Sequence, residues 1–62
     1  MTTIQNRVLD AIGTQSMTAE QVIHEVNRNG WRCSATQVKS ALQRLKKIGI
    51  VKRHDWHWWI PQ

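Results

Sequence analysis

The chain has 62 residues, of which 40% are hydrophobic and 21% charged, and it carries a formal net charge of +5 at pH 7. This length fits one small domain, 1–62. We expect no membrane span, because no apolar run reaches about 18 residues, and no signal peptide, because the first residues lack a continuous apolar stretch. Cys33 is its single cysteine and can form no internal disulfide, so we expect a cytoplasmic protein stabilised by its core alone.

The first two expected elements are helices. Apolar residues at positions 4, 8, 11 and 12 follow helical spacing, which predicts a helix from Thr2 or Thr3 to Ile12. The sequence Thr18–Gln21 has the form of a capping box, in which a hydroxyl and an amide side chain satisfy backbone groups at a helix start. It predicts a second helix that ends near Asn29, where a glycine follows.

The connections before and after the second helix each hold a large apolar side chain. Met17 precedes the helix, and we consider a short extended segment there that adds an apolar contact. Trp31 lies in the connection that follows the helix, and we expect its indole to close the core at this corner.

The third helix has the clearest pattern in the chain. A second capping box, Ser34–Gln37, begins it, and Gly49 follows its end, so the predicted range is 34–48. One face of this helix is apolar and is expected in the core; it consists of Val38, Ala41, Leu42, Leu45 and Ile48.

After Gly49 the pattern changes to β-branched and aromatic residues. Segments 50–53 and 56–60 predict two strands joined by a turn at His54-Asp55. One or two of the four tryptophans must fill the core, and because a domain this small has too little interior for all four, at least one should be exposed. Trp56 beside the turn is our candidate. The sequence therefore predicts an α+β fold, a three-helix bundle with a C-terminal two-stranded β-hairpin.

This layout resembles the winged helix-turn-helix superfamily of DNA-binding domains. The resemblance is sharpest in the string V-x-x-A-L-x-x-L-x-x-x-G-I-V at 38–51 and in W-W-I at 58–60. It implies a small winged helix in which helix 34–48 enters the major groove and the 50–60 hairpin is the wing that touches the DNA backbone.

Within the superfamily, the layout is distantly similar to the Z-alpha domains, which bind left-handed duplexes. Those domains have an asparagine and a tyrosine where this chain has Lys39 and Gln43, and a wing proline pair that is missing here. Of their motif only a wing tryptophan, Trp58 or Trp59, could correspond.

All of the excess positive charge lies in the second half of the chain. Residues 1–33 hold three basic and three acidic side chains, whereas residues 34–62 hold six basic side chains and Asp55 alone. On a helical wheel, the side of helix 34–48 opposite its apolar face is polar and free of carboxylates. Either this is a solvated face, with Lys46 and Lys47 stabilising the helix dipole, or it binds a polyanion. The candidate nucleic-acid-binding residues are Thr36, Lys39, Ser40, Gln43, Arg44, Lys47, Lys52, Arg53 and Trp56.

We expect a binding module and not an enzyme, because the chain has no glycine-rich phosphate loop and no nucleophile-and-base arrangement. His54, Asp55 and His57 surround a tight turn without metal-ligand spacing, so no metal, cofactor or small-molecule substrate is expected. The leading hypothesis is a small double-stranded DNA-binding transcriptional regulator that is nucleoid-associated if it is bacterial or phage. A homodimer is the oligomer that we consider for it. The alternatives are a protein-docking winged helix that uses the wing tryptophans and a binder of Z-form or RNA duplexes.

Overall fold

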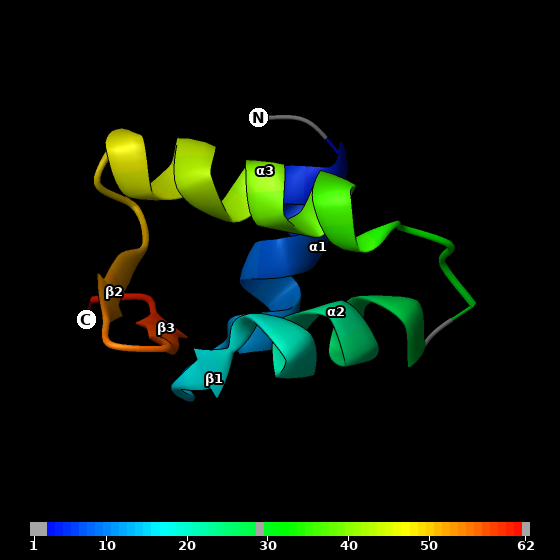
Figure 1. Ribbon diagram of the computed structural model, residues 1–62, viewed down its shortest axis with the longest axis horizontal. Helices are drawn as coiled ribbons and strands as arrows, with labels where there is room; N and C mark the ends of the chain where they lie inside the picture. The colour runs from blue at the N-terminus through cyan, green and yellow to red at the C-terminus, as the bar shows by residue number, and fades with distance from the viewer. Residues whose placement is uncertain (1–2, 29, 62) are drawn as a thin grey trace.

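The structure is a computed structural model that describes residues 3–28 and 30–61. Its elements follow one another as helix, strand, helix, helix, strand and strand (Figure 1). They are α1 (Thr3–Ile12), β1 (Met17–Thr18), α2 (Ala19–Arg28), α3 (Ala35–Lys47), β2 (Lys52–His54) and β3 (His57–Trp59). In Figure 1, α3 and α2 lie on opposite sides of the view, α1 passes behind them, and the strands gather at one end. The predicted small α+β architecture with three helices is confirmed.

Both predicted capping boxes are present. The backbone N–H of Gln21 donates to Thr18 Oγ1 at 3.2 Å, and the Gln21 amide oxygen accepts from the Thr18 N–H at 2.9 Å. The same reciprocal pair joins Ser34 and Gln37 at the start of α3. These bonds satisfy backbone donors that the first helical turn leaves unpaired, which fixes both helix starts. The predicted boundaries at Thr2 and Asn29 lie outside the described residues.

The helices of the described ranges are short, and none of them is long and apolar enough to cross a bilayer.

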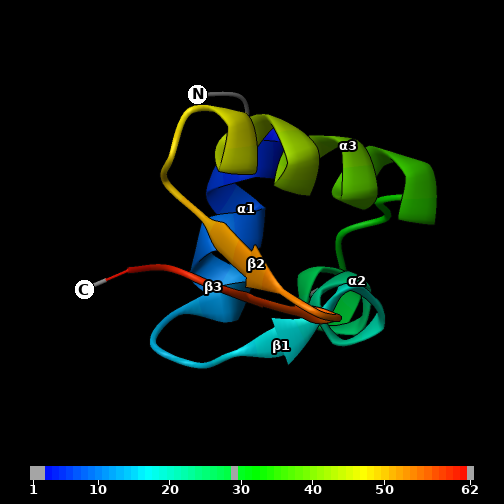
Figure 2. The ribbon, with the colours of Figure 1, turned by 60° about the vertical axis from the view of Figure 1, so that its left-hand side comes forward.

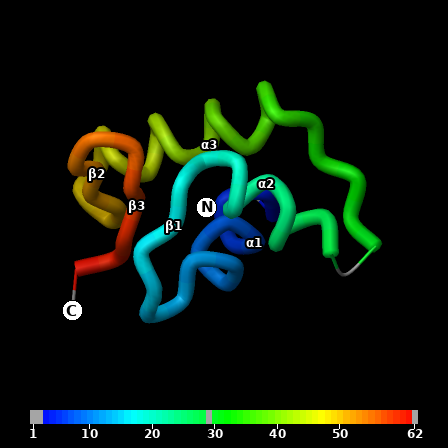
Figure 3. The backbone as a smooth tube through the Cα atoms, turned by 60° about the horizontal axis from the view of Figure 1, so that its bottom comes forward, coloured from blue at the N-terminus to red at the C-terminus, as the bar shows by residue number. Residues whose placement is uncertain are grey.

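The sheet has three antiparallel strands in the order β1-β3-β2, as Figure 3 shows. Met17 pairs with Trp58 and Thr18 with His57 on one side of β3, while β2 pairs on the other side. The prediction of a two-stranded sheet was therefore wrong by one strand. The segment before α2 is extended because its backbone completes the free edge of β3 and its Met17 side chain is buried beside Trp58.

The hairpin turn also differs from the prediction by one residue. His54 pairs with His57, so the turn residues are Asp55 and Trp56, and Asp55 adopts a positive φ of 54°. Aspartate tolerates this left-handed conformation better than most side chains do. The first strand of the hairpin begins at Lys52 and not at Ile50 as predicted. The reason is that the N–H groups of Ile50 and Val51 donate to the Leu45 carbonyl at the end of α3 instead of entering the sheet.

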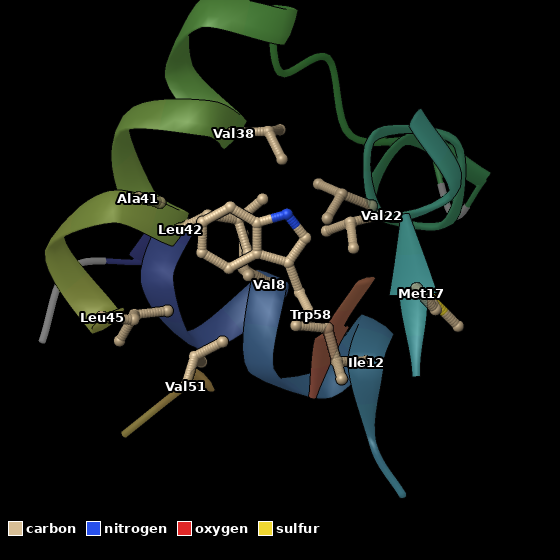
Figure 4. Packing of buried hydrophobic residues seen from close by; sticks show 11 residues of the cluster. Val8, Ile12, Met17, Val22, Val38, Ala41, Leu42, Leu45, Val51 and Trp58 are labelled. Atoms are coloured by element: carbon tan, nitrogen blue, oxygen red, sulfur yellow. The ribbon is translucent and has the colours of Figure 1, made fainter. Parts of the chain in front are cut away.

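A single tryptophan occupies the centre of the core. Trp58 is 5% exposed, and its indole lies between α1 and α3, near Val8 and Leu42 (Figure 4). The remaining buried hydrophobic side chains come from all three helices, from β1 and from the segment before β2; they are Ile12, Met17, Val22, Val26, Val38, Ala41, Leu45 and Val51.

Two residues that the sequence analysis placed in the core are exposed. Ile48 is 60% exposed because it is the C-terminal cap of α3, where the chain leaves the helix and its side chain no longer lies over the apolar face. Trp31 is 40% exposed. Instead of closing the core, its ring packs against the guanidinium of Arg7, which lies 4.0 Å from the ring centroid.

The tryptophans of the hairpin should differ sharply in their effect on stability. We expect Trp58→Ala to lower the free energy of unfolding by about 3–5 kcal/mol, because the cavity would lie in the centre of a small core. Trp56→Ala, at an exposed position, should change it by less than about 0.5 kcal/mol. Chemical denaturation followed by circular dichroism measures both, and equal losses in the two variants would contradict the assigned core.

Candidate nucleic-acid interface

The outward side of α3 presents all six helical candidates to solvent. Its buried positions are the apolar ones, so the exposed set keeps the helical arrangement expected from the sequence. The exposed candidates are Thr36, Lys39, Ser40, Gln43, Arg44 and Lys47. No carboxylate occurs anywhere in this helix. The side therefore combines neutral hydrogen-bonding groups with cations and contains no group that would repel an anion.

A cationic hollow joins the end of α3 to β2. It has a volume of about 260 Å³ and is lined by Lys46, Gly49, Val51, Lys52 and Arg53. Gly49 has a φ of 86°, which a side-chain-bearing residue rarely adopts, and this conformation lets the chain turn back beside the helix. Three cations from two elements thus surround one concave surface with no carboxylate among its lining residues.

Lys46 was absent from the candidates drawn from the sequence. On the helical wheel it lies at the margin of the polar side, and its position near the helix C-terminus offered a sufficient structural reason for a lysine. The return of β2 beside this margin makes Lys46 part of the hollow. Gly49 marks a reversal of the chain after the helix, but the sequence does not show beside which margin of the helix the chain returns.

The opposite margin of α3 faces α1. A second hollow of about 260 Å³ lies there, lined by Thr36, Ser40 and Arg44 together with apolar and amide side chains. Three of the helical candidates therefore border α1, while Lys46 borders β2. The polar side of α3 is bounded along its length by these two neighbours.

All three side chains of β2 are exposed, although side chains in a strand alternate between two faces. Neither face of this edge strand is therefore covered. In Figure 2 the hairpin leaves the end of α3, and its turn points away from α1 toward the side of the molecule that holds α2. Lys52 and Arg53 are thus placed on a projecting strand, close to the cationic end of α3.

Three of the four acidic side chains belong to the first two helices and not to α3 or β2. Asp10 belongs to α1, and Glu20 and Glu25 belong to α2, where Glu25 pairs with Arg28 at 3.3 Å. Asp55 in the hairpin turn is the exception, and its carboxylate lies 3.6 Å from His54 Nε2. Among the described residues, no three His, Cys, Asp or Glu side chains form a group that could hold a metal ion.

Asn27 fixes the connection that leads into α3. Its amide oxygen accepts from the Cys33 N–H at 2.7 Å, and its amide nitrogen donates to the carbonyls of Cys33 and Ile23 at 3.0 and 2.8 Å. One side chain therefore ties the residue before the Ser34 cap to the last turns of α2. This role of Asn27 is not evident from the sequence, because it depends on the path of the loop between α2 and α3.

Comparisons of the chain with family models, curated proteins and solved structures found no match.

We expect Asn27→Ala to lower the free energy of unfolding by on the order of 1–3 kcal/mol, because it removes three hydrogen bonds from partly buried backbone groups. Asn6→Ala, an exposed change in α1, is the matched control and should cost less than about 0.5 kcal/mol. Amide hydrogen exchange should also show lost protection at Cys33. Equal stability of the two variants would contradict the clamp.

Proposed function

We propose that the chain is a winged-helix domain that binds double-stranded DNA, with α3 in the major groove and the β2–β3 hairpin on the adjacent backbone. The observation that carries the proposal is the charge of the surface that runs from α3 through the cationic hollow to β2. No aspartate or glutamate occurs between Ser34 and His54, and six lysines and arginines do. DNA presents a dense row of phosphates that such a surface attracts.

The arrangement of elements supports this assignment. Three helices with a three-stranded antiparallel sheet, in the order helix, strand, helix, helix, strand and strand, are compatible with a winged-helix layout. In that layout α2 and α3 form the helix-turn-helix, and the second of these helices reads base edges. With 13 residues, α3 is about 20 Å long, and its diameter of about 10–12 Å with side chains fits the major groove, which is about 12 Å wide.

The side chains of α3 divide naturally between base edges and phosphates. Gln43 can form a bidentate pair with adenine, and the hydroxyls of Thr36 and Ser40 can donate to or accept from a base. The flanking cations would contact phosphates and fix the orientation of the helix. A small transcriptional regulator is the role that this reading supports, and a homodimer on paired half-sites would supply specificity that one module lacks.

Two alternatives, protein docking and binding of a left-handed duplex, depend on the wing tryptophans and have less support. Trp58 fills the core and Trp59 is half-buried, so Trp56 is the one exposed tryptophan in the described hairpin. One indole offers little apolar area for protein docking. The same burial removes Trp58, one of the two tryptophans that could correspond to the Z-alpha motif, from contact with a left-handed duplex.

The affinity for a mixed-sequence duplex should fall steeply with salt. If the six cations contact phosphates, the slope of log affinity against log salt concentration should approach about −5. These cations are Lys39, Arg44, Lys46, Lys47, Lys52 and Arg53. Fluorescence anisotropy with a labelled duplex at several salt concentrations measures the slope.

A pair of charge-matched variants tests the location of the interface. Lys52→Gln should reduce the steepness of the slope by about 1, because one phosphate contact is lost. Arg28→Gln removes the same charge from α2, outside the proposed surface, and should leave the slope nearly unchanged. Equal effects of the two substitutions, or affinity that does not respond to salt, would overturn the proposal.

A further inference from the structure

The hairpin ends in an exposed indole. Trp56 is 73% exposed, the highest value among the described large hydrophobic side chains, and it occupies the second position of a two-residue turn. A turn at the surface normally favours small or polar residues, so local structure does not account for a tryptophan there. A flat aromatic surface held in water is suited to stacking against another ring.

The surrounding hairpin holds this indole in place. Arg53 Nε donates to the Asp55 carbonyl at 2.9 Å, and its guanidinium lies 6.0 Å from the Trp56 ring centroid and 5.6 Å from that of Trp58. Trp58 in turn lies in the core and pairs with both neighbouring strands. The turn that carries the indole is therefore anchored to the core, so a ligand would have to order the Trp56 side chain but not its backbone.

The charges near the tip indicate the chemistry of that ligand. Lys52 and Arg53 precede it on the exposed β2 strand, and these two cations outnumber the one carboxylate of the turn, Asp55, which lies 3.6 Å from His54 Nε2. A partner with a π-face and an anionic backbone matches an indole beside two cations, and a nucleobase in DNA has both. An apolar protein partner would match the ring but not the cations.

We propose that Trp56 stacks on a base that is not covered by its neighbour, so that the domain prefers DNA with interrupted base stacking over an intact duplex. The proposal rests on the proposed DNA binding and adds the class of DNA that the tip recognises. Inserting a ring into an intact step requires unstacking of the two bases, whereas a gap exposes a base face at no such cost. The preferred substrate is a duplex interrupted by a one-nucleotide gap or a comparable defect.

The test compares two labelled duplexes that are identical except for a central one-nucleotide gap. By fluorescence anisotropy, we expect the unsubstituted protein to bind the gapped duplex about 5- to 30-fold more tightly than the intact one. Trp56→Ala should abolish this preference, because the gapped duplex loses the stacking contact that the intact duplex never makes. Trp56→Leu keeps an apolar side chain without the ring and should behave like the alanine variant. Trp31→Ala, which removes the other exposed tryptophan, is the control and should keep the preference.

A second readout reports stacking directly. The fluorescent base 2-aminopurine, placed opposite the gap, should be quenched by the unsubstituted protein and remain bright with Trp56→Ala. A gap preference that survives in Trp56→Ala would reflect DNA flexibility and would overturn this inference while leaving the proposed function intact. The inference would also be overturned if sedimentation showed a dimer that Trp56→Ala dissociates while the quenching of 2-aminopurine stayed unchanged. Failure to bind either duplex would overturn the proposed function itself.

Discussion

The burial of one side chain, the indole of Trp58, determines where the hairpin lies against the helices. Its strand, β3, is paired on both edges, with Met17 of β1 on one side and Arg53 of β2 on the other. Its ring fills the space between α1 and α3. The sheet is thus fixed to the bundle through its central strand, which frees the edge strand β2 from any part in the core.

The distribution of charge follows from this anchoring. Because β2 buries none of its side chains, Lys52 and Arg53 stay in solvent, and Gly49 returns the strand beside Lys46. The cations of α3 and of the hairpin then form one surface, while three of the four carboxylates lie on α1 and α2. Such separation of charge orients an approaching polyanion toward a single face of the molecule.

Local signals made much of the fold predictable from the sequence. Capping boxes and apolar periodicity gave the three helices, and the exposed side of α3 follows from the same periodicity. The two-residue strand β1 was not predictable as a sheet member, because its partner is about 40 residues away and its length carries no pattern. Likewise, the solvent position of Trp31, the hydrogen bonds of Asn27 and the contribution of Lys46 depend on where other segments pass. These are tertiary contacts that local sequence does not encode.

The central claim is that one continuous surface, formed by α3 and the β2–β3 hairpin, meets DNA. Titration of the isotopically labelled chain with a short duplex, followed residue by residue through backbone amide NMR shifts, tests it most directly. We predict large shifts along Thr36–Lys47 and Lys52–Trp56, with small shifts over α1 and over the α2 residues Glu20–Glu25. Shifts concentrated on the acidic side of α1 and α2, or no shifts in dilute buffer, would contradict it.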